Sequence, residues 1–261
     1  MKFSANLGFL WADLDLPVAI RAAGEAGFDA VECHAPYAFG ADEISAALKD
    51  TGLSMLSLNT KFGGHGEAGV AALPGRESTA RQCIDQAIEY AAAIDCPKVH
   101  VLAGRSDRGQ EAEHVYRENL SYATGRASFY GLTVLIEPLN TNDMADYHLV
   151  SADRAAETIE AVGADNLKLM IDCFHTSVMH GAVEPVLERV MPHIGHIQFA
   201  SIPDRGEPDR GELDYQTLLP WLVELGYDGL FGAEYHPTES VESGLGWLHR
   251  WHEHRTGGVK P

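Results

Sequence analysis

The sequence has no run of eighteen apolar residues, and the absence of such a run excludes a membrane-spanning helix. Its first residues, MKFSANLGFLWADLD, are interrupted by polar side chains, and no apolar stretch leads to a small-residue cleavage site. A secretory signal needs both features. We therefore expect a protein without a membrane partner.

Basic residues are also scarce, because 19 Lys and Arg stand against 38 Asp and Glu, which gives a net charge of −19. A field of this sign repels phosphate backbones. We therefore expect no nucleic-acid partner. The same charge keeps a protein soluble, and solubility alone is enough to explain the excess.

Cysteine is rare as well, and the four cysteines form no C-x-x-C pair. They are Cys33, Cys83, Cys96 and Cys173, and three of the four lie in apolar contexts. Scattered cysteines of this kind are typical of reduced thiols in a protein core. We therefore expect a cytoplasmic location.

The sequence does contain eight strand-like segments, most of them followed by a helical pattern. The predicted strands cover 2–9, 28–35, 53–60, 98–104, 134–136, 167–175, 193–200 and 229–237. The predicted helices lie near 15–27, 41–52, 76–95, 111–130, 151–163, 184–191, 214–225 and 240–253, with Ser151 as an N-cap.

Eight alternating strands and helices in 261 residues indicate a (β/α)8 TIM barrel. An open doubly wound sheet would usually carry a Gly-rich phosphate turn after its first strand, and NLGFLWADLD is no such turn. No stretch resembles a linker. The prediction is a single barrel domain over 1–261, with a C-terminal tail at about 254–261.

Oxygen-bearing side chains stand at four successive strand ends, 26 to 36 residues apart: Glu137, Asp172, Gln198 and Glu234. All strands of a barrel end on the same face, so these side chains should converge there. Strand alternation agrees, because the neighbouring outward positions such as Ile171 and Ile197 are apolar.

Three carboxylates brought together would repel one another unless a cation lay among them. An all-oxygen set suits a hard divalent metal such as Mg²⁺ or Mn²⁺ better than zinc. The alternative is that each carboxylate caps a helix or pairs with an arginine. Four such positions in successive units favour the metal site.

Further polar residues follow the same strands. His175 could hydrogen-bond a substrate oxygen or orient Glu137, or be an ordinary loop histidine. Arg205 has the fork shape that recognises a carboxylate, or it pairs with Glu207 at the surface. Glu32 could support a neighbouring polar side chain below the metal. The other histidines near strand ends, His34, His65, His196 and His236, are expected to pack or face solvent.

Aromatic residues in the loops of the same face could close a pocket over a small substrate: Phe9, Trp11, Tyr37 and Phe62. They could equally be buried at a subunit interface, which leaves a homo-oligomer open.

Several motifs together resemble the hydroxypyruvate isomerase family of the xylose-isomerase-like barrels. They are FSANLGF, LPGRE, LIEPLN, IDCFH, GHIQFA with RGEPDRGELDY, and GAEY. The resemblance implies a metal held by Glu137, Asp172, Gln198 and Glu234, with the two glutamates as the acid/base pair. His100, in KVHVLAG, is similar to the related 2-oxo-tetronate isomerases and is a candidate substrate contact.

The expected reaction interconverts hydroxypyruvate and tartronate semialdehyde through an enediolate. A 2-oxo-tetronate isomerase, or an epimerase or dehydratase of a small polyol acid, is the alternative on the same barrel. An abasic-site nuclease would need more histidine ligands and a basic groove. A third possibility is a non-catalytic barrel whose metal is only structural. Unchanged turnover after replacement of the metal would support it.

Overall fold

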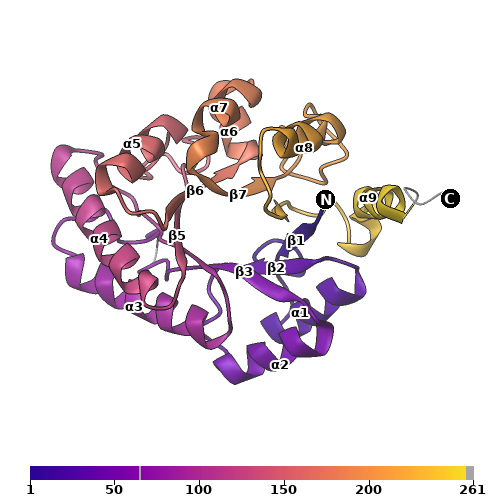
Figure 1. The fold of residues 1–261 in the computed structure, drawn as a ribbon, viewed down its shortest axis with the longest axis horizontal. Helices are drawn as coiled ribbons and strands as arrows, with labels where there is room; N and C mark the ends of the chain where they lie inside the picture. Colours follow the sequence, from indigo (N-terminus) through magenta and orange to yellow (C-terminus); the bar gives the residue numbers. More distant parts are fainter. Residues whose placement is uncertain (65, 257–261) are drawn as a thin grey trace.

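The computed structural model describes residues 1–64 and 66–256, and its strands close into a parallel barrel in sequence order (Figure 1). Each strand pairs with the next, and the first pairs with the last. The strands are β1 (Phe3–Asn6), β2 (Ala30–Cys33), β3 (Ser54–Asn59), β4 (Lys98–His100), β5 (Thr133–Ile136), β6 (Leu167–Asp172), β7 (Ile194–Phe199) and β8 (Phe231–Ala233). The predicted TIM barrel is confirmed.

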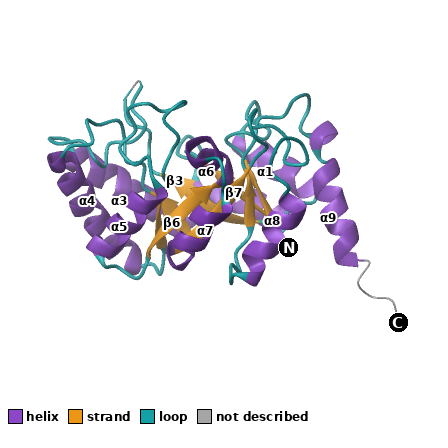
Figure 2. Cartoon of the chain, turned by 90° about the horizontal axis from the view of Figure 1, so that it is seen from above, coloured by secondary structure: helices purple, strands orange, loops and turns teal. Residues whose placement is uncertain are grey.

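Helices surround the barrel, and the longer loops gather at one end of it (Figure 2). The α-helices are α1 (Leu16–Glu25), α2 (Ala41–Thr51), α3 (Glu77–Ala93), α4 (Gln110–Ser128), α5 (Ala152–Val162), α6 (Cys173–His180), α7 (Glu184–Val190), α8 (Tyr215–Glu224) and α9 (Gly246–Thr256). The short 3-10 helices are η1 (Met191–His193) and η2 (Glu242–Gly244).

The strands bury their apolar side chains against this helical layer. Ile171, Ile197 and Phe231, predicted to face outward, belong to the apolar cluster shared with the helices. Leu135 and Met170, predicted to face the barrel interior, are buried outside that cluster. The alternation predicted from the sequence therefore holds, and it turns Asp172 and Gln198 toward the barrel axis.

Some predicted boundaries were wrong. The strand expected over 167–175 ends at Asp172, and α6 begins at once. The Asp172 carboxylate accepts a hydrogen bond from Phe174 N at 2.8 Å and so caps this helix. His175 is therefore a helical residue, neither in a strand nor in a loop. The helix expected near 240–253 is divided into η2 and α9.

Other local predictions were correct. Ser151 is the N-cap of α5, with its hydroxyl 3.5 Å from Arg154 N, and Gly163 ends the helix with a φ of 68°. Three of the four cysteines are buried, and none of the four is in a disulfide.

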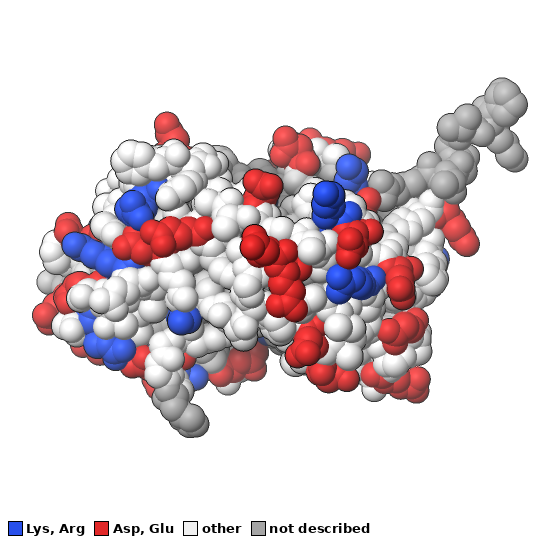
Figure 3. All heavy atoms as spheres, turned by 90° about the horizontal axis from the view of Figure 1, so that it is seen from below, with Lys and Arg blue, Asp and Glu red and all other residues white. Residues whose placement is uncertain are grey.

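The α9 helix continues to Thr256, and positions 257–261, where most of the predicted C-terminal tail falls, lie outside the described residues. Among the described residues, no helix is both long and apolar enough to cross a membrane. On the face in Figure 3, acidic side chains are spread among fewer basic ones, in line with the net charge of −19.

Candidate active site

A cavity of about 530 Å³ opens at the carboxyl ends of the strands, and we call it the mouth cavity. Six of the seven predicted site residues line it: His100, Glu137, His175, Gln198, Arg205 and Glu234. The seventh, Asp172, is completely buried and contacts Arg205. The four predicted ligands therefore lie around one mouth, each from a different strand end.

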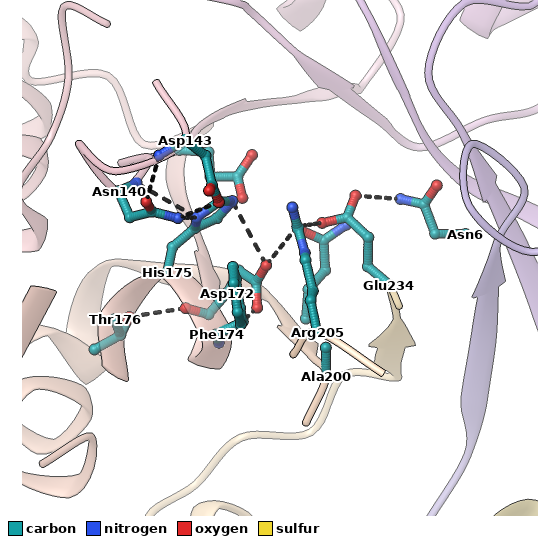
Figure 4. A network of polar contacts seen from close by, with 12 residues as sticks. Asn6, Asn140, Asp143, Asp172, Phe174, His175, Thr176, Ala200, Arg205 and Glu234 are labelled. Carbon is teal, nitrogen blue, oxygen red and sulfur yellow. Dashed lines mark hydrogen bonds and ion pairs between the residues drawn. The ribbon is translucent and has the colours of Figure 1, made fainter. Parts of the chain in front are cut away.

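Arg205 bridges two of these carboxylates (Figure 4). Its Nη2 donates to Asp172 Oδ2 at 2.9 Å and to Glu234 Oε2 at 2.6 Å. The guanidinium lies over the rings of Phe9 and Phe174, 4.6 and 4.9 Å from their centroids. The surface pair with Glu207 does not form, because Glu207 accepts hydrogen bonds from Thr238 instead.

The three carboxylates carry charge unequally. Burial, then the charges of Glu234 and Asp172, raise the pKa of Glu137 well above its usual range. Burial also raises the pKa of Asp172, to about 7, although Arg205 opposes it. For Glu234, burial is outweighed by Arg205 and His34, which lower its pKa to about 2. One guanidinium therefore does not neutralise the whole cluster.

His175 is held in one tautomer by Asn140 (Figure 4). Its Nδ1 lies 2.6 Å from Asn140 Nδ2 and 3.3 Å from Asn140 N, and both of these groups are donors. The side-chain amide of Asn140 cannot flip, because its Oδ1 accepts hydrogen bonds from the backbone N–H groups of Asn142 and Asp143. Nδ1 must therefore accept, which leaves the proton on Nε2.

The protonated Nε2 of His175 lies 3.7 Å from Asp172 Oδ2 and faces the site. Burial lowers the pKa of His175 to about 3, so the ring is neutral at neutral pH. Burial likewise lowers the pKa of His100 to about 3, and its Nδ1 lies 3.8 Å from Glu137 Oε2. Both rings can offer a hydrogen bond to a bound molecule without adding charge.

The mouth has unused hydrogen-bonding capacity. Of the nine buried side-chain nitrogen and oxygen atoms without a hydrogen-bond partner among the described residues, five belong to it: both ring nitrogens of His100, Glu137 Oε1, Gln198 Oε1 and Arg205 Nε. Buried polar atoms are rarely left unpaired in a native protein unless they serve a ligand. The oxygen atoms among them suit a cation, and the N–H groups of Arg205 and His100 suit an anion.

The residues present therefore fit a divalent metal. Glu137, Asp172 and His175 each place one ligating atom within 4.8 Å of the others. Because His175 Nε2 carries a proton in the tautomer set by Asn140, we favour the unpaired oxygen of Gln198 over this ring as a further ligand. The all-oxygen set suits Mg²⁺ or Mn²⁺.

Several contributors were missed or misplaced by sequence reasoning. Asn6 donates to Glu234 Oε1 at 2.7 Å, and His34 Nε2 lies 3.3 Å from the same oxygen. Asn6 had a signal, since it is polar at the end of an apolar strand. Phe9, Phe62 and His236 line the mouth, whereas Trp11 bonds Glu242 and Tyr37 bonds Asn59 O. His65 lies outside the described residues.

A second cavity, of about 560 Å³, lies between α9 and the segment 208–216, which leads into the start of α8. It is lined by Trp247 and Trp251, and the hydroxyl of Tyr215 in its wall is already bonded to Ala200 O. Among the described residues, none of the buried polar atoms without a partner lines this cavity. The chemistry therefore belongs to the mouth cavity.

Comparison with known proteins identifies relatives of the chain. The family model described as xylose isomerase-like TIM barrel matches residues 20–251. A 2-oxo-tetronate isomerase of Cupriavidus necator is 42% identical, and the match covers 95% of this chain and 97% of that one. A Danio rerio protein named "Putative hydroxypyruvate isomerase" is 40% identical, over 100% of this chain and 99% of that one.

Among solved structures, a Brucella melitensis protein described as AP endonuclease, family 2, superposes with a TM-score of 0.93. It is 38% identical, and the match covers 96% of this chain and 98% of that one. A 3-keto-D-glucoside 4-epimerase of E. coli has a TM-score of 0.81 at 21% identity, over 96% and 99% of the two chains. That likeness extends to the fold alone.

Proposed function

Because the chain belongs to the xylose isomerase-like TIM barrel family, we propose that it is a metal-dependent isomerase of a small hydroxy/oxo acid. The proposed reaction interconverts hydroxypyruvate and tartronate semialdehyde. The observation that carries the proposal is the site itself: three buried carboxylates and an unpaired glutamine oxygen converge at the carboxyl end of the barrel. Such a set needs a cation and can move protons.

The reaction moves one carbon-bound proton between neighbouring carbons. A base removes a proton from C3 of hydroxypyruvate and returns one to C2, while the hydroxyl proton passes from O3 to O2. A bound divalent ion would polarise the two oxygens and stabilise the enediolate charge. We assign proton transfer to Glu137 and Glu234, whose pKa values their surroundings shift in opposite directions.

The remaining residues bind and orient the substrate. His175 donates from Nε2 to a substrate oxygen, because Asn140 occupies its Nδ1. Both hydrogens of Arg205 Nη2 are donated to Asp172 and Glu234, but its Nε–H has no partner, and we assign an oxygen of the substrate carboxylate to this Nε–H. His100 lies beside Glu137 with both ring nitrogens unpaired and is a third contact.

A 2-oxo-tetronate isomerase is the second candidate. It is favoured by the relative from Cupriavidus necator that carries this name, and by the unpaired His100. The two candidate substrates differ by one carbon, and both present a carboxylate next to a carbonyl. An epimerase or dehydratase of a polyol acid would share the metal but leave a different product.

The test is proton NMR of the purified protein with hydroxypyruvate and with 2-oxo-tetronate, each with and without Mn²⁺. We expect an aldehyde signal from hydroxypyruvate, or the C2 proton signal of the 3-oxo isomer from 2-oxo-tetronate, and only with the metal. No conversion of either acid would contradict the proposal. A cytoplasmic location, a homo-oligomer and the absence of nucleic-acid partners stay predictions of the sequence.

A further inference from the structure

Below the mouth cavity, a group of polar side chains lies inside the barrel around Glu32. Its carboxylate is 1% exposed. The hydroxyl of Ser4 donates to Oε1, and His196 Nε2 lies 3.0 Å from the same oxygen. Oε2 accepts from Gln198 Nε2 at 3.0 Å and from Ser57 at 3.4 Å. These partners come from β1, β3 and β7, so the group ties together separate parts of the barrel.

The eighth strand makes room for this group. A Cβ at Gly232 would lie 2.4 Å from Glu32 Oε1 and 2.9 Å from both Gln198 Cγ and His196 Nε2. A Cβ atom does not come that close to another heavy atom in a real protein, so any side chain here would displace the carboxylate or the amide. The glycine on β8 therefore allows the Glu32–Gln198 contact.

That contact decides which way the amide of Gln198 points. The two ends of a glutamine amide have similar size, but one is a donor and the other an acceptor. An ionised carboxylate only accepts, so it must face the NH₂ end. The carbonyl oxygen is then at the other end, where Oε1 is buried, without a hydrogen-bond partner, on a side chain that lines the mouth.

We propose that Glu32 is a positioning residue that turns Gln198 so that its carbonyl oxygen, rather than its NH₂ group, is presented to the cation in the mouth. This inference rests on the metal site of the proposed function. It explains why a carboxylate that touches neither substrate nor cation is kept in the barrel interior, where an unpaired charge would be very costly. Without Glu32 the amide could present either end, and the NH₂ end repels a cation.

The first test is the Mn²⁺ affinity of the metal-free protein with Glu32→Gln, measured by electron paramagnetic resonance without substrate. The new amide can donate to Gln198 Oε1 and so allow the reversed orientation. We expect Mn²⁺ binding to weaken by about 10–100-fold, the usual effect of changing a group that orients a ligand. The Mn²⁺ concentration for half-maximal activity should rise with it, while saturating Mn²⁺ restores most of kcat.

The double variant Glu32→Gln/Gln198→Glu should rescue binding. The amide introduced at position 32 then donates to one oxygen of the carboxylate at position 198, and the other oxygen still faces the mouth. Because a carboxylate at position 198 strengthens cation binding by itself, the rescue is judged against Gln198→Glu alone, which the double variant should match or exceed. The matched control is Glu113→Gln, the same change at another histidine-paired glutamate, which lies between helices and should leave Mn²⁺ affinity unchanged.

The outcomes separate the two proposals. If the wild type does not bind Mn²⁺, the metal site of the proposed function fails. If the wild type binds Mn²⁺ and folded Glu32→Gln binds it equally well, only the positioning role is overturned. The positioning role is also overturned if the double variant folds but does not recover Mn²⁺ binding. If Glu32→Gln does not fold, the test is instead the exchange rate of the Gln198 side-chain amide protons in the wild type, measured by NMR. Slowly exchanging Gln198 amide protons support the proposal, and rapidly exchanging ones overturn it.

Discussion

Two carboxylate sites in this protein, the half-buried Glu113 and the buried mouth, have opposite surroundings. Glu113, on α4, accepts from four donors: His148 at 3.1 Å, Arg117 at 2.6 Å, Thr158 at 3.1 Å and Arg154 at 3.4 Å. The hydrogen bond from His148 is the main cause that lowers its pKa to about 2. In the mouth, one guanidinium bridges only two of the three carboxylates, and Glu137 Oε1 has no hydrogen-bond partner among the described residues.

The comparison separates a carboxylate that stabilises the fold, Glu113, from the mouth carboxylates, which are available for chemistry. The Glu113 cluster joins α4 to α5 and to the loop that carries His148, and all of its capacity is used within the protein. The mouth instead keeps unpaired oxygens and a raised pKa, which costs stability. Removing charge should therefore harm the first site through folding and the second through activity.

Metal removal should have the largest effect. We expect dialysis against a chelator to abolish turnover and Mg²⁺ or Mn²⁺ to restore it. Because a cation neutralises the mouth, Mn²⁺ at one hundred times its Kd should also raise the free energy of unfolding by about 2.7 kcal/mol. Calorimetry with and without Mn²⁺ measures this. Full turnover by metal-free protein would assign the mouth a different chemistry.

Glu137→Gln and Glu234→Gln should come next. Each change keeps an oxygen that can ligate, but the amide cannot accept a proton at neutral pH. We expect kcat to fall by about 10²–10⁴-fold, the usual share of general acid–base catalysis, while Mn²⁺ is still bound. Thermal unfolding of metal-free Glu137→Gln should show no loss of stability, because the change relieves repulsion. A clear loss of stability would place Glu137 with Glu113 as a structural residue.

Glu113→Gln should show the opposite profile. We expect the free energy of unfolding to fall by about 2 kcal/mol, a typical value for hydrogen bonds to a charged group, with kcat unchanged. The pKa of Glu113 is lowered from 4.5 to about 2, so its contribution is fully present above pH 4.5 and disappears as the pH falls toward 2. The free energies of unfolding of the wild type and of Glu113→Gln, measured in urea across that pH range, should therefore converge as the pH falls.

Arg205→Lys should have the smallest effect of the changes in the mouth. An ammonium group keeps the positive charge beside Asp172 and Glu234 but has no Nε–H to donate to the substrate carboxylate. We expect KM for the acid substrate to rise about tenfold, the share of one charge-assisted hydrogen bond. If KM is unchanged in steady-state assays, Arg205 serves only as a counter-ion for the two carboxylates.

The barrel and its four strand-end ligands could be predicted because they follow from local patterns. Apolar runs of strand length, repeated at strand–helix spacing, place Glu137, Asp172, Gln198 and Glu234 on one face. The inward position of Glu32 follows from the same alternation. None of this depends on how distant loops fold.

The rest depends on tertiary contacts that no periodicity records. The α6 helix starts inside an apolar run because the Asp172 carboxylate caps it. Arg205 lies in an irregular loop with a φ of 54°, and only the folded barrel brings it between Asp172 and Glu234. The contact of Asn140 with His175 joins residues 35 positions apart in two different loop–helix units.

The most direct test of the central claim, that the mouth glutamates move a proton as well as bind a metal, is deuterium exchange in D₂O. Wild-type protein with Mn²⁺ is incubated with hydroxypyruvate, and loss of the C3 proton signal is followed by NMR. We predict wash-in of solvent deuterium by the wild type, and far slower wash-in by metal-loaded Glu137→Gln and Glu234→Gln. Exchange at the wild-type rate in either variant would make that glutamate a ligand only, and His175 would be the next group to test as the base.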